Sequence, residues 1–92
     1  MKRIERKLFQ LSDEIEALDR AEHLALEELN YHLHLNDDAQ RDAAVSDHPI
    51  DRADARETAS DVSRFERHLD QLRSKRSKLE AKRDGLIDRL GN

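Results

Sequence analysis

DAAVSDHPIDRADA, residues 42–55, decides the fold, because it places the only proline of the chain, Pro49, between two long amphipathic runs. On both sides of it, apolar residues recur at alternating spacings of three and four, the pattern of a coiled-coil seam. The seam positions are Ile4, Leu8, Leu11, Ile15, Leu18, Ala25 and Leu29 before the proline, and Ala55, Val62, Phe65, Leu69, Leu72, Leu79, Leu86 and Leu90 after it. The chain is therefore predicted to form one long helix, turn near Pro49 and return.

The two runs match layer by layer when they are set antiparallel. The residue numbers of facing positions then add up to a nearly constant value, as they do for Leu11 with Leu86 and for Leu29 with Leu69. A constant sum is what an antiparallel pairing of two helices requires. The predicted fold class is all-α, an antiparallel two-helix coiled-coil hairpin with the turn near Pro49.

The hairpin is expected to be a single domain over residues 1–92. Its expected elements are a first helix over about residues 2–44, a tip over residues 45–51 and a second helix over about residues 51–90. Pro49 fits a loop or a first helical turn, where its missing N–H costs nothing. Ser46, Asp47 or Asp51 could cap the second helix, and the sequence does not choose among them.

Composition excludes several classes of protein. Of the 92 residues, 41% are charged and only 3% are aromatic, which suits a coiled coil better than a globular core. The absence of cysteine excludes disulfides and thiol chemistry. No apolar run approaches the roughly 20 residues that cross a membrane, and residues 1–10 show no signal peptide. We expect a cytoplasmic protein that makes no membrane contact.

Charge is unevenly distributed along the chain. Residues 36–61 carry eight acids and three arginines, whereas residues 62–92 carry nine bases and five acids, and the first seven residues are also basic. The folded hairpin is therefore predicted to have an acidic tip and a basic open end. These charges either belong to ordinary solvated helix faces or suit a basic cleft or a bound metal ion as the partner of the tip.

Polar and small residues interrupt the apolar seam. Glu22 and Arg76 fall opposite each other, so we expect an ion pair between the helices that fixes their register. Arg83 is expected to extend outward over its methylene stem. Near the tip the layers pair Ala39 with Thr58 and Ala43 with Ala55, so the tip is predicted to be narrow.

The first helix also carries apolar residues that the seam does not need. They are Leu24, Leu26, Tyr31, Leu33 and Leu35. An apolar surface this broad on a two-helix hairpin needs a cover. Homodimerisation into a four-helix bundle and docking on a larger protein are two explanations. A third is that the seam shifts register here and some of these residues are core.

No pattern for catalysis, metal binding or cofactor binding is found. His32 and His34 lie two apart, so on a helix they point to different faces, and the other histidines are scattered. Glycine-rich phosphate loops and nucleophile motifs are absent, so we expect neither an enzyme nor a bound metal or cofactor. The bases of residues 73–83 are interleaved with acids and lack aromatic neighbours, so direct nucleic-acid binding is not expected.

The tip carries the most distinctive motif. Asp51, Arg52 and Ala53 match the second acid, the arginine and the alanine of the tip signature Asp-x-x-Asp-x-Ala, and Asp47-His48-Pro49-Ile50-Asp51 is similar to its His-Pro variant. Here the chain resembles the coiled-coil finger of the DksA/TraR family, bacterial regulators that insert a helical hairpin into the secondary channel of RNA polymerase. The resemblance carries motif content over residues 42–67 and hairpin architecture elsewhere.

This resemblance implies a transcription regulator whose tip carboxylates approach the active centre of the polymerase. Its partner-binding residues would be Asp47, His48, Asp51, Arg52 and Ala53. The chain departs from the family in two ways: His48 stands where the family has its first acid, and the cysteine-based zinc finger is missing. The alternative is a structural or adaptor coiled coil that dimerises or binds a protein through the apolar residues of the first helix. In that reading Asp47 and Asp51 are only helix caps.

Overall fold

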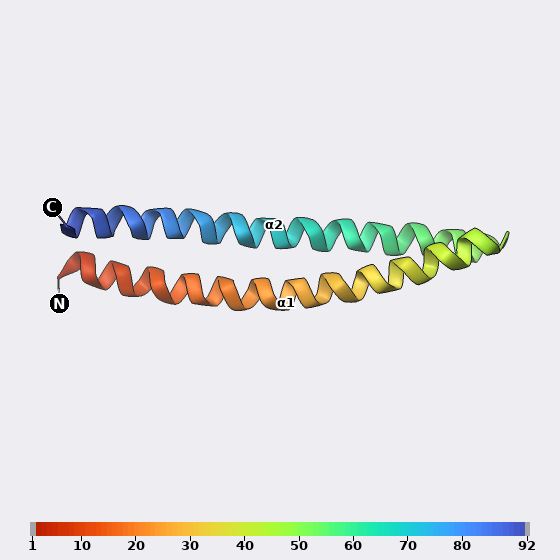
Figure 1. Cartoon of the computed structure of the whole chain (residues 1–92), viewed down its shortest axis with the longest axis horizontal. Helices are drawn as coiled ribbons and strands as arrows, with labels where there is room; N and C mark the ends of the chain where they lie inside the picture. Colours follow the sequence, from red (N-terminus) through yellow and green to blue (C-terminus); the bar gives the residue numbers. More distant parts are fainter. Residues whose placement is uncertain (1, 92) are drawn as a thin grey trace. The chain divides into compact units, whose positions relative to one another are not determined.

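The structure, a computed structural model, describes residues 2–91 and contains two α-helices. Helix α1 spans Arg3–Val45 and helix α2 spans Pro49–Gly91, and the described residues form no strand (Figure 1). The link between the helices is Ser46-Asp47-His48. The all-α antiparallel hairpin with its turn beside Pro49 is thus confirmed. Neither helix has a stretch that is long and apolar enough to cross a membrane within residues 2–91.

Helix α2 begins two residues earlier than the sequence indicated. Pro49 is its first residue, at the position where proline is favoured because its N–H would have no helical partner and its φ is already helical. Helix α1 extends to Val45. The link is therefore shorter than the expected tip.

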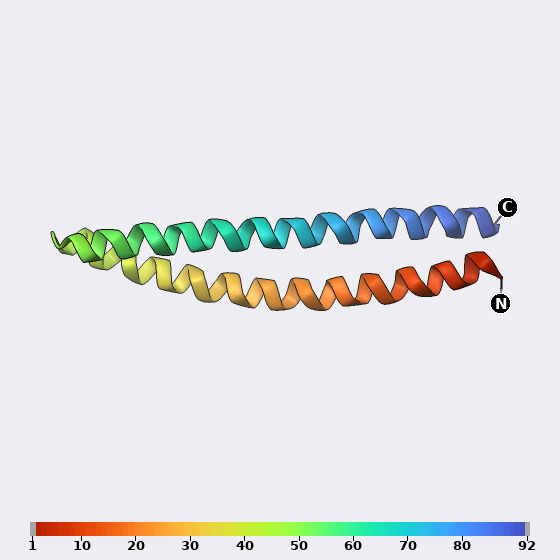
Figure 2. The same cartoon turned by 180° about the vertical axis from the view of Figure 1, so that it is seen from behind.

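The hairpin groups into two compact units. The turn unit comprises Leu24–Leu69, and the open-end unit comprises the described residues up to His23 and from Asp70 onward. Within each unit a segment of α1 lies beside an antiparallel segment of α2, and both views place the start of α1 beside the end of α2 in the open-end unit (Figures 1 and 2).

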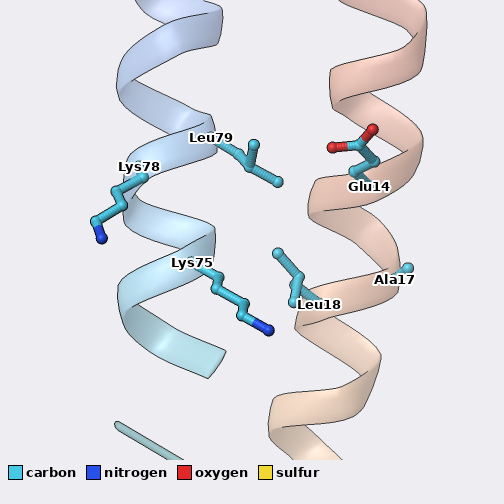
Figure 3. Close-up of a pocket in the computed structure, with 6 residues that line it drawn as sticks. All are labelled: Glu14, Ala17, Leu18, Lys75, Lys78 and Leu79. Atoms are coloured by element: carbon cyan, nitrogen blue, oxygen red, sulfur yellow. The ribbon is translucent and has the colours of Figure 1, made fainter. Parts of the chain in front are cut away.

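In the open-end unit the seam positions pack as predicted, except at the last layer. Leu11 is 1% exposed, and Leu18 and Leu79 project into the space between the helices (Figure 3). Burying a leucine in such a layer contributes roughly 1.5–3 kcal/mol. Leu90 was expected in the seam but is 48% exposed, because no further layer covers it. The apolar seam therefore weakens toward the open end.

One layer of the open-end unit is charged. Glu22 is 9% exposed, and both its carboxylate oxygens accept hydrogen bonds from Arg76, with Nη2 of Arg76 lying 3.0 Å from Oε1. Arg73 adds a contact at 3.7 Å, and Arg76 also pairs with Glu80 on its own helix. The Arg76 guanidinium holds the pKa of Glu22 below its ordinary value, against the opposing effect of burial. The predicted ion pair between the helices is confirmed.

The other charged seam residue, Arg83, does not cross to α1. Its guanidinium Nη2 lies 3.2 Å from Asp84, the next residue along α2, and about a third of its side chain is exposed. Arg83 therefore extends outward over its methylene stem, as expected.

In the turn unit the seam is mixed. Leu29, Val62 and Leu69 are buried, and the His32 ring stacks on the Phe65 ring with their centroids 4.3 Å apart. The facing positions predicted from the sequence therefore do meet in this unit. The register follows the heptads.

Candidate functional site

The turn is organised by His48. Its backbone N–H donates to Ser46 Oγ at 3.1 Å, and its Nδ1 accepts from the backbone N–H of Ile50 at 3.2 Å. Its carbonyl oxygen accepts from the N–H of Asp51 at 3.2 Å. A residue that caps a helix does both things, because its carbonyl opens the helical ladder and its side chain satisfies a free N–H of the first turn. His48 is therefore the N-cap of α2.

None of the three caps considered from the sequence has this role. Ser46 Oγ accepts from the N–H of His48, which belongs to the link and not to the helix. The carboxylates of Asp47 and Asp51 accept no hydrogen bond from residues 2–91. The reason is geometric. The ring nitrogen Nδ1 stands at the same distance from the backbone as the side-chain oxygen of asparagine, so histidine at this position can replace the usual cap.

The two tip carboxylates are consequently available. Asp47 is exposed and Asp51 is half-buried, and the described part of the chain contains no ion pair to either. Asp51 lies in the first turn of α2, where the partial positive charge of the helix N-terminus stabilises an anion. Both groups can accept hydrogen bonds or approach a cation on a partner. The alternative in which these two residues act as helix caps is wrong.

The remaining predicted tip residues are also accessible. His48, Arg52 and Ala53 are exposed. Arg52 lines a shallow recess of about 490 Å³ whose other walls are mostly alanines of both helices. The structure thus brings all five predicted residues to one end of the turn unit.

Two apolar side chains at the tip were not predicted as part of the site. Val45 is 87% exposed at the end of α1, and Ile50 is 62% exposed in the first turn of α2. They flank the link that carries Asp47, so a partner would meet apolar and acidic groups together. The signal that could have found them is that neither falls on a seam position, although both are β-branched and apolar.

The helices behind the tip are held closely together. Ala55 is 6% exposed, and Gln40 Nε2 donates to the Ala55 carbonyl oxygen at 3.1 Å across the hairpin. Gln40 also donates to Asn36 Oδ1 at 3.1 Å, and Thr58 Oγ1 lies 3.1 Å from the same oxygen. A side chain can reach a backbone carbonyl on the other helix only where the helices approach closely. Side-chain hydrogen bonds thus hold the two helices together behind the predicted narrow tip.

The apolar residues of α1 form a second candidate surface. Their exposed fractions are Leu24 57%, Leu26 40%, Tyr31 61%, Leu33 39% and Leu35 38%. The seam positions between them, Ala25 and Leu29, are buried. The alternative in which the seam shifts register is therefore wrong.

These residues do not make one surface, however. Successive residues of an α-helix are turned by about 100°, so Leu24 and Leu26 point roughly 200° apart. Leu24, Tyr31 and Leu35 recur at spacings of seven and four and share one side of the seam, and Leu26 and Leu33 share the other. The single surface considered from the sequence is two stripes, named here the Leu24 stripe and the Leu26 stripe.

The open-end unit offers a recess of about 460 Å³ between the helices (Figure 3). Leu18 and Leu79 form its floor, Lys75 extends across toward Leu18, and Lys78 points away. Within residues 2–91 no group of three or more His, Asp or Glu side chains is placed to hold a metal ion.

Comparison with known proteins adds no relative: no protein-family model matches the chain, and neither a curated protein nor a solved structure is significantly similar to it.

Proposed function

We propose that this chain is a DksA-like transcription regulator that inserts its acidic tip into the secondary channel of RNA polymerase. The observation that carries the proposal is that the cap of α2 and the acidic groups of the tip are different residues. His48 caps α2, so Asp47 and Asp51 are not needed as its cap, and both carboxylates remain open to a partner. In this proposal the chain acts in the cytoplasm of a bacterium, uses no cofactor and catalyses no reaction.

The shape and chemistry of the turn unit support the proposal. A channel admits only a narrow object, and the close approach at Ala55 keeps the helix pair narrow behind the tip. Carboxylates brought near a metal-containing active centre alter its electrostatics, because the metal ions are the largest local charges there. Val45 and Ile50 add exposed apolar groups that could pack on the channel wall.

The test is binding of the full chain to purified bacterial core RNA polymerase. The variants are Asp51→Asn and, as a matched control, Asp70→Asn, which removes the same charge at an exposed position far along α2. Losing a charge-assisted contact costs about 1.5–3 kcal/mol, so Asp51→Asn should weaken binding about tenfold or more, and Asp70→Asn should leave it unchanged.

A competitor that fills the channel should block binding of the wild-type chain. The helical content of both variants is checked by circular dichroism. Absence of binding by a well-folded chain would contradict the proposal, and so would binding that the competitor leaves intact.

A second candidate is a structural or adaptor coiled coil, which the exposure of the two stripes favours. Leu24 and Tyr31 are more than half exposed, and apolar groups on a helix face are a common means of dimerisation or of docking on a protein. Leu24→Glu with Tyr31→Glu should abolish an interaction through the Leu24 stripe, and Leu26→Glu with Leu33→Glu should abolish one through the Leu26 stripe. Both double variants should spare a monomeric regulator. Asp51→Asn should do the reverse, so these variants separate the candidates.

A further inference from the structure

The open-end unit contains a second groove whose lining is strongly basic. Its volume is about 940 Å³, and Ile4 and Leu86 form its apolar floor. The cations along its walls are Arg3, Arg6 and Lys7 from α1, and Lys82 and Arg89 from α2. The lining contains no carboxylate, and none of these five cations forms an ion pair with any residue between 2 and 91. This recess, named here the basic groove, thus gathers five cations that no carboxylate of residues 2–91 pairs with.

The groove favours an occupant of defined chemistry. Like charges around one recess repel each other, so an anion placed among them gains more than it would beside a single lysine. The apolar floor favours an occupant that also brings aliphatic side chains, since these lose contact with water there. The fitting occupant is an acidic protein segment with exposed apolar residues.

The tip of this same chain has that chemistry. Asp47 and Asp51 are unpaired, Val45 and Ile50 are exposed beside them, and residues 36–61 carry eight acids against three arginines. The tip belongs to the turn unit, in which Val45 ends α1, and the basic groove belongs to the open-end unit, in which Arg3 begins it. We propose that the tip of one copy docks in the basic groove of a second copy.

A head-to-tail contact of this kind leaves a free tip and a free groove at the two ends of every complex. Heterologous contacts that do not close produce open chains of molecules, so assembly should increase with concentration. The inference does not depend on the proposed function. If both hold, self-docking would occupy the carboxylates that the polymerase needs.

An anionic bilayer fits the open end less well than a protein segment does. A helix that binds a bilayer presents its bases and its apolar residues to one side. Here the exposed Phe9 shares a side of α1 with Arg6 but is turned about 200° from Lys7, and the exposed Ile87 is turned about 200° from Arg89, so the apolar groups and the bases do not gather on one face. A single-stranded nucleic acid would need aromatic side chains for base stacking, and the groove lining has none.

The test is sedimentation velocity of the full chain over a range of concentrations at low and high salt. The groove variant is Lys7→Glu with Lys82→Glu, the tip variant is Asp47→Lys with Asp51→Lys, and the control is Lys75→Glu with Lys78→Glu. Wild type should assemble at about 50 mM salt, and its association should weaken at least about tenfold at about 500 mM, because added salt screens charges beyond a few ångströms. The control should assemble like wild type.

Mixing the two variants provides the decisive result. The groove variant and the tip variant should each be monomeric alone, and an equimolar mixture should associate, because the unchanged tip of the groove variant meets the unchanged groove of the tip variant. A wild-type chain that stays monomeric at low salt would overturn the proposal. So would assembly that survives high salt and both variants, as expected for lateral pairing of the apolar stripes. Binding of the wild-type monomer to anionic vesicles or to an oligonucleotide without self-association would overturn it as well.

Discussion

Replacing Arg76 should destabilise the hairpin more than replacing Glu22, although the two residues form one ion pair. Side-chain exposure is 11% for Glu22 and 33% for Arg76, so the acid is the partner that depends on the pair. In Arg76→Leu the buried carboxylate keeps only Arg73, whose Nε lies 3.7 Å away. In Glu22→Leu the arginine keeps Glu80 and its access to water.

The expected magnitudes follow from this asymmetry. Removing one partner of a fully buried pair costs about 3–5 kcal/mol; the remaining contact with Arg73, and partial burial of the new leucine at a position that is 33% exposed, should recover part of it, so Arg76→Leu should lose about 2–3 kcal/mol. For a chain of this size the melting temperature should fall by about 10–20 °C. Glu22→Leu gains about 1.5–3 kcal/mol from burying the new side chain, which offsets the lost pair. Its stability should equal or exceed that of wild type.

The two variants should also differ in their response to acid. Because Arg76 lowers the pKa of Glu22 from its ordinary value of 4.5, the contribution of the pair is complete above about pH 4.5. It is lost as the pH falls further, through the lowered pKa. In Arg76→Leu the unpaired carboxyl can take up a proton, so the deficit relative to wild type should shrink as the pH falls below about 4.5.

The assay is thermal unfolding by far-ultraviolet circular dichroism at about pH 7 and about pH 3, at one fixed protein concentration. Arg67→Leu, at an exposed position of α2 with no ion pair among residues 2–91, serves as the control. Equal losses for Arg76→Leu and Glu22→Leu at neutral pH would refute the reasoning. So would a deficit of Arg76→Leu that is the same at both pH values.

Two further predictions concern the cap and the core. His48→Ala should lower the free energy of unfolding, measured in urea, by about 1 kcal/mol, because the N–H of Ile50 loses its acceptor. His48→Asn should keep an acceptor at this place and therefore keep the stability. Equal losses in the two variants would show that the ring nitrogen does not cap α2. Leu69→Ala should cost about 2–5 kcal/mol because Leu69 is 3% exposed, and Leu24→Ala, at 57% exposure, should change stability by less than about 0.5 kcal/mol; a large loss in Leu24→Ala would mean that the Leu24 stripe is covered in solution.

The seam could be predicted from the sequence because its signal is repeated. Each heptad position is constrained by the one before it and by the facing run, so Glu22 opposite Arg76 followed from counting alone. The same repetition predicts Leu90 as a seam residue, and this prediction is wrong because Leu90 is half exposed. At a helix end the period continues in the sequence, but there is no next layer to bury it.

The sequence predicts where the turn lies but not which residue caps α2. Ser46, Asp47 and Asp51 all have better statistics as caps than histidine, and the choice was decided by which side-chain atom the three-residue link brings to the N–H of Ile50. The sequence identifies the apolar residues of α1 but not their division into two stripes. Leu24 and Leu26 are close in sequence, yet on a helix they point to opposite sides of the seam.

The alanine layer beside the turn sets the distance between the two helices there. Ala43 and Ala55 contribute only methyl groups to the layer, so the thickness of the hairpin there is set by the two smallest side chains that still pack. Exchanging Ala55 for leucine would insert a wedge that spreads the helix ends without altering a single charge or the link itself. Width and charge at the tip are thus controlled by different residues. Selection or an engineer can therefore change the width of the tip while keeping its charge.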